Sequence, residues 1–122
     1  MDERKRRGDR GEAAVAAALE RRGYRILERQ YRCRWGEIDL IVWAPEGTLC
    51  FVEVKSRTGT RFSAPREAVT AAKQRRLRSA ASWYLAQREL DCPCRFDVAE
   101  VWASVRHGWD KPNLNYIISA FS

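Results

Sequence analysis

The sequence predicts a mixed α/β domain in which helices flank a single β-sheet, in the order helix, three strands, helix, two strands. Alternating apolar and polar residues mark five segments as strands. Two further segments are rich in helix-forming residues, one before the first strand and one after the third. The length of 122 residues suits one compact domain and is too short for two. These observations together favour helices packed around one sheet.

Each element has its own local signal. The first helix is alanine-rich and ends at Gly23, and the second follows Ser63 as a possible cap and Pro65 as a first residue. The expected elements are a helix over 11–22, strands over 24–33, 36–43 and 48–57, a helix over 66–87, and strands over 95–102 and 114–121.

The second and third strands form a predicted hairpin around Pro45-Glu46-Gly47, which suits a type I turn followed by a left-handed glycine. Closing the hairpin there pairs residues whose numbers sum to 92. The even positions then make an apolar face that we assign to the core, consisting of Ile38, Leu40, Val42, Cys50, Val52 and Val54.

The odd positions of the same hairpin are charged. Asp39 falls opposite Glu53, and Glu37 falls opposite Lys55. Like charges directly opposed on a sheet are destabilising, so Asp39 and Glu53 are expected to share a cation. Lys55 lies on the same face, about 6–7 Å along the strand from Glu53.

A divalent ion between two carboxylates would relieve this repulsion. Mg²⁺, or Mn²⁺ in its place, is the expected ion because it binds through few carboxylates, several waters and phosphate oxygens. Such a centre can polarise a phosphodiester and supply hydroxide, with Lys55 as an adjacent cation. The simpler alternative is a cross-strand ion pair between Glu37 and Lys55 on a solvated face.

The charge balance indicates the type of partner. The chain carries 23 Lys and Arg against 16 Asp and Glu, a formal charge of +7, and the segment 55–78 alone accounts for a surplus of the same size. Such a surface binds phosphate backbones. The candidate nucleic-acid-binding residues are Arg57, Arg61, Arg66, Lys73, Arg75, Arg76 and Arg78.

Composition argues against other classes. With 45% hydrophobic and 32% charged residues, the chain can bury a core, which argues against disorder. Its longest apolar run, Ala13 to Leu19, is far shorter than the ~20 residues of a membrane span, and the basic N-terminus lacks a secretory apolar region. We expect a cytoplasmic protein with reduced cysteines and no membrane partner.

Two tryptophans bear on ligand binding. Trp35, just before the hairpin, could stack on a base, although a half-buried position at a strand edge is the more ordinary reading. Trp83 is expected to pack the long helix onto the sheet together with Tyr84 and Leu85.

Four motifs resemble those of the YraN-like family of small bacterial proteins. They are Gly-Asp-Arg-Gly-Glu at 8–12, Gly-Glu-Ile-Asp-Leu-Ile at 36–41, Phe-Val-Glu-Val-Lys-Ser-Arg at 51–57 and Arg-Phe-Asp-Val at 95–98. That family resembles a branch of the restriction-endonuclease-like superfamily, similar to archaeal Holliday-junction resolvases. The sequence departs from the family pattern at Gln30, Ser63 and Tyr116.

The resemblance implies a restriction-endonuclease-like domain over residues 11–122, preceded by a basic N-terminal arm over 1–10 that could be mobile. It implies that Asp39 and Glu53 bind the metal, that Lys55 assists catalysis, and that Glu12 supplies a further acid. The implied substrate is DNA, including branched or damaged DNA, and a homodimer would suit a symmetric junction.

Three functional hypotheses follow from the sequence. The first is a Mg²⁺-dependent endonuclease, and the second is a DNA- or RNA-binding module with the same fold that does not cut. The third is a scaffold domain in which the acidic residues belong to an internal ion-pair network. Binding to nucleic acid that weakens steeply with salt separates the first two from the third.

Overall fold

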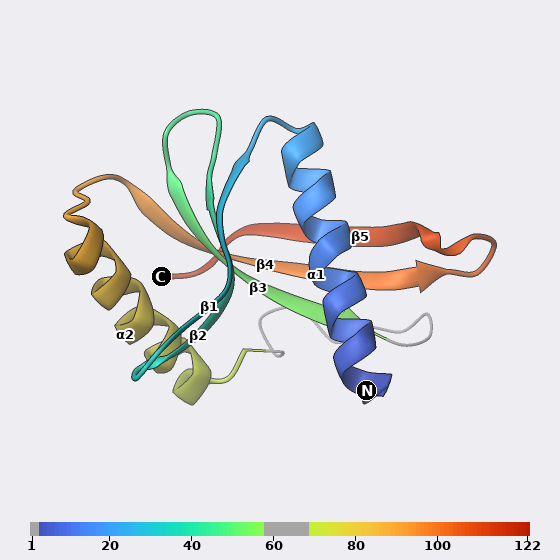
Figure 1. Cartoon of the computed structure of the whole chain (residues 1–122), viewed down its shortest axis with the longest axis horizontal. Helices are drawn as coiled ribbons and strands as arrows, with labels where there is room; N and C mark the ends of the chain where they lie inside the picture. The colour runs from blue at the N-terminus through green and yellow to red at the C-terminus, as the bar shows by residue number, and fades with distance from the viewer. Residues whose placement is uncertain (1–2, 58–68) are drawn as a thin grey trace.

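The computed structural model describes residues 3–57 and 69–122 and has the predicted order of elements (Figure 1). The elements are α1 (Glu3–Arg21), β1 (Arg25–Cys33), β2 (Gly36–Trp43), β3 (Leu49–Arg57), α2 (Ala71–Arg88), β4 (Cys94–Ser104) and β5 (Gly108–Phe121). The five strands form one mixed sheet in the order β1-β2-β3-β4-β5. The predicted α/β class is therefore confirmed.

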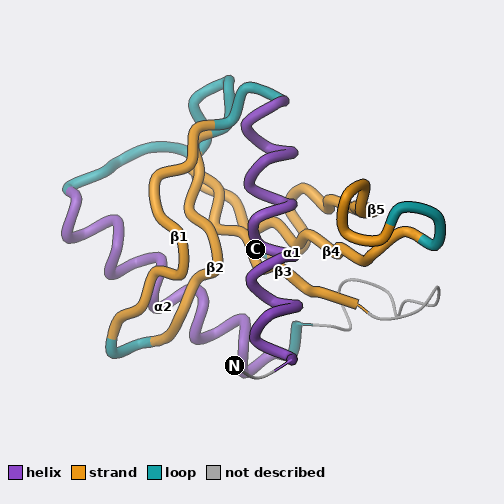
Figure 2. The backbone as a smooth tube through the Cα atoms, turned by 45° about the vertical axis from the view of Figure 1, so that its right-hand side comes forward, coloured by secondary structure: helices purple, strands orange, loops and turns teal. Residues whose placement is uncertain are grey.

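The two helices cover opposite faces of this sheet. Neighbouring strands are antiparallel except β3 and β4, which are parallel and connected through α2. Helix α1 packs mainly on β3 and β4, whereas α2 packs on β2 (Figure 2). The central strands are consequently buried on both faces, as expected for strands with apolar residues on both sides.

Each helix has its own hydrophobic core. The core under α1 comprises Val15, Ala16, Leu19, Leu40, Val42, Ala44, Cys50, Val52, Ala99 and Val101. The core under α2 comprises Ile38, Ile41, Leu49, Phe51, Val69, Leu77, Ala80, Ala81, Tyr84 and Val98. Ile41 and Phe51, apolar residues at odd positions of the hairpin, are thus covered by α2.

Both helices differ from their predicted bounds. Helix α1 begins at Glu3 instead of residue 11, so most of the arm expected over 1–10 is helical. Helix α2 begins at Ala71 instead of residue 66, because Thr70 is its N-cap and accepts a hydrogen bond from the Lys73 N–H through Oγ1 at 3.1 Å. The proposed cap Ser63 and first residue Pro65 lie outside the described residues.

The hairpin register is confirmed near its turn. The Ala44 N–H donates to the Thr48 oxygen at 2.8 Å, and Gly47 has a left-handed φ of 98°. Pairing then continues through Leu40 opposite Val52, as the predicted sum of 92 requires.

The last strand is longer than predicted and starts at Gly108. It contains Pro112, which is tolerated because β5 is an edge strand. All four cysteines are free thiols. Neither helix, within the residues described, is long and apolar enough to cross a membrane.

Candidate active site

The central sheet divides where β2 and β3 separate. The backbone pairing of these strands ends at Leu40 and Val52. Beyond this pair, the N–H of Val54, two residues after Val52, donates a 2.7 Å hydrogen bond to Oδ2 of Asp39, the residue before Leu40. From there β2 continues with β1 toward α2, whereas β3 continues with β4 beneath α1 (Figure 1). The side chain of Asp39 thus replaces a backbone acceptor and lies in the opening between the two strands.

Because β2 and β3 separate here, the predicted hairpin pairing is wrong beyond Leu40. Ile38 was expected on the same face as Leu40, but it belongs to the core under α2 while Leu40 belongs to the core under α1. Glu37 was expected opposite Lys55, but its carboxylate forms an exposed ion pair with Arg32 of β1, with a nitrogen–oxygen distance of 3.6 Å. The predicted alternative, an ion pair between Glu37 and Lys55 across β2 and β3, is therefore absent.

Glu53 is the most deeply buried acid of the opening, with a side chain only 4% exposed. Two lysines contact its Oε1: Lys73 Nζ of α2 at 2.8 Å and Lys55 Nζ of its own strand at 3.5 Å. Burial lowers the pKa of Lys73, but the hydrogen bond and charge of Glu53 outweigh it and raise the pKa above its ordinary value. Lys73 therefore holds its proton and neutralises Glu53.

Asp39 and Glu53 repel each other. The pKa of Asp39 is raised to about 7, first because the carboxyl is buried and second because of the nearby charge of Glu53. The hydrogen bond from Val54 and the charge of Lys73 act in the opposite direction and only partly compensate. The lysines of the opening therefore only partly balance its negative potential at Asp39.

Glu12 approaches the same opening from α1. Gly11 lets this helix lie close to β3 and β4, because a Cβ at that position would come within 2.1 Å of Ser56 Oγ and 2.9 Å of Val101 Cγ1. Glu12 is 8% exposed, burial raises its pKa, and Gln30 Nε2 donates to its Oε2 at 3.4 Å. Its charge adds to those that raise the pKa of Asp39. Glu12, Asp39, Glu53 and Lys55 thus gather at one end of the sheet.

The predicted nucleic-acid-binding residues divide into several groups. Arg75 and Arg76 are exposed on α2, while Arg78 is partly buried and donates through Nη1 to the Ser122 oxygen at 3.0 Å. Arg57 forms a 3.0 Å ion pair with Glu100, which is 1% exposed. Lys73 belongs to the acidic opening. Arg61 and Arg66 lie outside the described residues.

Two members of this constellation were not predicted from the sequence to lie in it. Lys73 was assigned to phosphate binding, although its position one turn after a Thr cap places it at the sheet-facing start of α2. Gln30 was noted only as a departure from a family pattern, and its left-handed φ of 52° had no sequence signal. Asp97, a further buried acid, is held by Arg95, Tyr116 and the Ser119 N–H and is structural.

The donor atoms in the opening determine which metal ion they fit. Across residues 9–57 and 69–122, whose side chains the structure describes, no three His, Cys, Asp or Glu side chains gather closely enough to form a metal-binding group. Asp39 and Glu53 remain as two carboxylates that repel each other. Two carboxylates suit Mg²⁺, which retains several waters, and do not suit a closed structural zinc site.

Comparisons with known proteins give a consistent family. The model of the uncharacterised protein family UPF0102 matches residues 11–101. A UPF0102 protein of Symbiobacterium thermophilum is 56% identical over 98 residues, covering 80% of this chain and 82% of the relative. Relatives from Moorella thermoacetica and Geobacter metallireducens are 50% and 44% identical, covering 81% and 93% of this chain and 82% and 90% of their own.

Proposed function

Because the chain belongs to the uncharacterised protein family UPF0102, the YraN-like group its motifs resemble, and carries paired acids beside lysines, we propose a metal-dependent nuclease. The proposed reaction is hydrolysis of DNA phosphodiester bonds. The observation that carries this proposal is the Asp39–Val54 hydrogen bond, which opens the sheet beside Glu53 and Lys55.

Asp39 and Glu53 would hold the metal, with Mg²⁺ or Mn²⁺ as the proposed ion. When bound, the ion would supply Lewis acidity and a more acidic water. The pKa of Asp39, raised first by burial and second by the charge of Glu53, supports this assignment, because a shared cation would favour the ionised carboxylate and offset its repulsion with Glu53.

The chain's own residues would position the substrate. Lys55 Nζ, 25% exposed and 3.5 Å from Glu53, can contact a phosphate oxygen and offset its developing charge. Lys73 pairs with the buried Glu53 at 2.8 Å and would hold this carboxylate in place as a ligand. Glu12, with its raised pKa, can accept or donate a proton at the edge of the opening.

The test is cleavage of branched, duplex and single-stranded DNA in Mg²⁺ or Mn²⁺, followed by EDTA. We expect metal-dependent cleavage that falls at least about 100-fold in Asp39→Asn, Glu53→Gln and Lys55→Met. Glu37→Gln is the matched control, because Glu37 is two residues from Asp39 but pairs with Arg32 on the surface. Cleavage that persists in Asp39→Asn would refute the assignment.

One observation favours a second candidate, a nucleic-acid-binding module that does not cut. Lys73 already neutralises Glu53 at 2.8 Å, so the buried acid is compensated by the protein itself. In this case Asp39→Asn and Glu53→Gln would bind DNA as tightly as the parent or more tightly, since negative charge is lost. Calorimetric titration with Mn²⁺ separates the two, because only the nuclease requires the ion to bind.

A further inference from the structure

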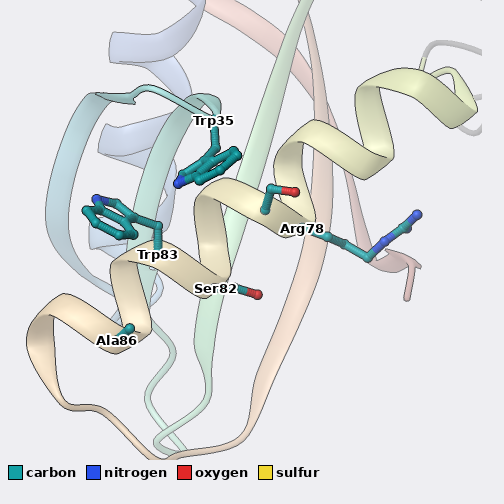
Figure 3. Close-up of a pocket in the computed structure, with 6 residues that line it drawn as sticks. Trp35, Arg78, Ser82, Trp83 and Ala86 are labelled. Carbon is teal, nitrogen blue, oxygen red and sulfur yellow. The ribbon is translucent and has the colours of Figure 1, made fainter.

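A pocket outside the acidic opening lies on the outer surface of α2. It has a volume of about 430 Å³ and is lined by Trp35, Arg78, Ser79, Ser82, Trp83 and Ala86 (Figure 3). Trp83 was expected to pack the helix onto the sheet, but its side chain is 40% exposed, while its neighbour Tyr84 is buried. Trp35 is 45% exposed. Two large aromatic surfaces therefore remain open to solvent.

The position of Trp35 is built into the fold. Trp35 belongs to the tight turn between β1 and β2, and the next residue, Gly36, lies against the backbone of α2. A Cβ on Gly36 would come within 3.3 Å of the Arg76 carbonyl oxygen, and its φ of +155° is unfavourable for other residues. Only glycine lets the turn approach this closely, and the approach holds Trp35 beside the helix that carries Trp83 (Figure 3).

The charge around the pocket is positive. Helix α2 contains five basic residues and no acidic one. The guanidinium of Arg34 lies 5.0 Å from the centre of the Trp35 ring, and Arg78 lines the pocket itself. A ligand that is both flat and anionic matches this surface, whereas a second copy of this chain would bring like charge against it.

We propose that Trp35 and Trp83 form a stacking site for an unpaired base of a single-stranded nucleic-acid segment, with Arg75, Arg76 and Arg78 contacting its phosphates. Aromatic platforms beside basic side chains are how proteins hold single strands. The volume of the pocket lies within the range of small-ligand sites and admits a nucleobase.

The stacking site extends the proposed function, and the identification of its ligand as DNA rests on that function. Lys73 and Trp83 are ten residues apart on α2, or about 15 Å along the helix axis. A strand following α2 would therefore connect the acidic opening to the pocket within a few nucleotides. The proposed substrate class is DNA with an unpaired region, such as a flap, tail or junction.

The experiment measures binding in EDTA, so that cleavage plays no part. Fluorescence anisotropy compares a single-stranded oligonucleotide, a duplex with a single-stranded tail and a blunt duplex. Trp35→Ala and Trp83→Ala are each expected to weaken binding of the first two by about tenfold and of the blunt duplex by less than about twofold. Trp35→Phe and Trp83→Phe keep an aromatic surface and should restore most of the affinity.

Ile118→Ala is the control for loss of exposed apolar surface, because Ile118 is 56% exposed on β5. An equal loss for all three ligands, or no loss for the single strand, would overturn the stacking site. So would a change in oligomeric mass of the tryptophan variants, which would assign the pocket to contact between copies.

These outcomes are separate from those of the proposed function. If the parent protein cleaves DNA but the tryptophan variants bind single strands normally, only the stacking site fails. If the parent binds no nucleic acid at low salt, both proposals fail. If it binds but never cleaves, the stacking site survives on a non-catalytic module.

Discussion

The carboxylate of Asp39 accepts a hydrogen bond from the Val54 N–H at 2.7 Å, and this contact ends the pairing of the two central strands. A side chain here takes the role of a backbone acceptor, so Val54 stays satisfied while the strands part. The same contact fixes an acidic group beside buried Glu53. One hydrogen bond therefore both separates the two strands and holds two acidic side chains close enough to repel each other.

The first prediction concerns the pH dependence of stability at Asp39. Its pKa is about 7 in the folded chain, against 3.8 for an ordinary aspartate. Between these values the folded state binds more protons than the unfolded state, so this carboxyl makes the free energy of unfolding fall as pH rises. Without metal, Asp39→Asn should stabilise the protein by about 1–3 kcal/mol at pH 8 and hardly at all at pH 4.

Thermal or urea unfolding at the two pH values measures this difference. Asparagine can still accept from Val54, so the change isolates the charge. Asp91→Asn, at an exposed position, is the control and should have no effect at either pH. Equal stabilisation at both pH values would show that ionisation of Asp39, disfavoured by burial and by Glu53, is not the cause.

The second prediction concerns the ion pair between Lys73 and Glu53. Lys73→Met would remove the nearer of the two cations that contact Glu53, whose side chain is 4% exposed, and leave the more distant Lys55 at 3.5 Å. We expect a loss of about 1–2 kcal/mol, below the values for fully buried pairs because Lys73 is 38% exposed. In a double-mutant cycle with Glu53→Gln, the coupling energy should account for most of this loss.

Arg75→Met provides the comparison, because Arg75 is basic, exposed and two residues away on the same helix. Its loss should leave the free energy of unfolding nearly unchanged. A coupling energy near zero for Lys73 and Glu53 would mean that the ion pair makes no net contribution, and that Lys73 is free to contact substrate.

The hairpin shows how far sequence reasoning reaches. Its register near the turn was predictable because the loop residues restrict the turn type, and each strand pair then follows in order. The predicted pairing failed at Asp39, because the hydrogen bond from Val54 to the Asp39 side chain competed with backbone pairing between the strands. Periodicity contains no information on that competition, so Ile38 and Glu37 were assigned to the wrong neighbours.

Helix α2 illustrates a different limit. Ser63 and Thr70 are both acceptable caps, and local propensity does not rank them. The position of Lys73 against Glu53 depends on how α2 docks on the sheet, which only tertiary packing decides. The three acids and the one lysine that lie in family motifs, Glu12, Asp39, Glu53 and Lys55, could be found from the sequence, whereas the cation from α2 and the aromatic pocket could not.

The third prediction separates structural from binding arginines. Arg57 was assigned to nucleic acid, but it pairs at 3.0 Å with Glu100, which is 1% exposed. Arg57→Met should therefore lower the free energy of unfolding by about 2–3 kcal/mol, because it leaves a buried carboxylate without this partner. Arg76→Met, on the exposed side of α2, should instead weaken DNA binding and reduce its salt dependence without destabilising the fold.

Urea unfolding and DNA titration at two salt concentrations measure both effects in parallel. Arg57→Met/Glu100→Gln should recover part of the lost stability, since the second change removes the buried charge. If Arg57→Met weakens binding as much as Arg76→Met while stability is unchanged, the original assignment of Arg57 to the nucleic-acid surface is correct.

The fourth prediction concerns Asp97, whose side chain is fully buried between β4 and β5. Three groups satisfy it: Tyr116 Oη at 2.5 Å, Arg95 Nε at 3.1 Å and the Ser119 N–H at 2.9 Å. Tyr116→Phe removes one donor from a buried carboxylate and should cost about 1–3 kcal/mol in unfolding free energy. Tyr31→Phe is the matched control, because the Tyr31 hydroxyl donates to Gln87 Oε1 at 3.3 Å in an exposed position, and its loss should cost far less. Equal costs for the two hydroxyls would contradict the network, whereas a large cost at Tyr116 with DNA binding intact would establish Asp97 as an internal support of the sheet.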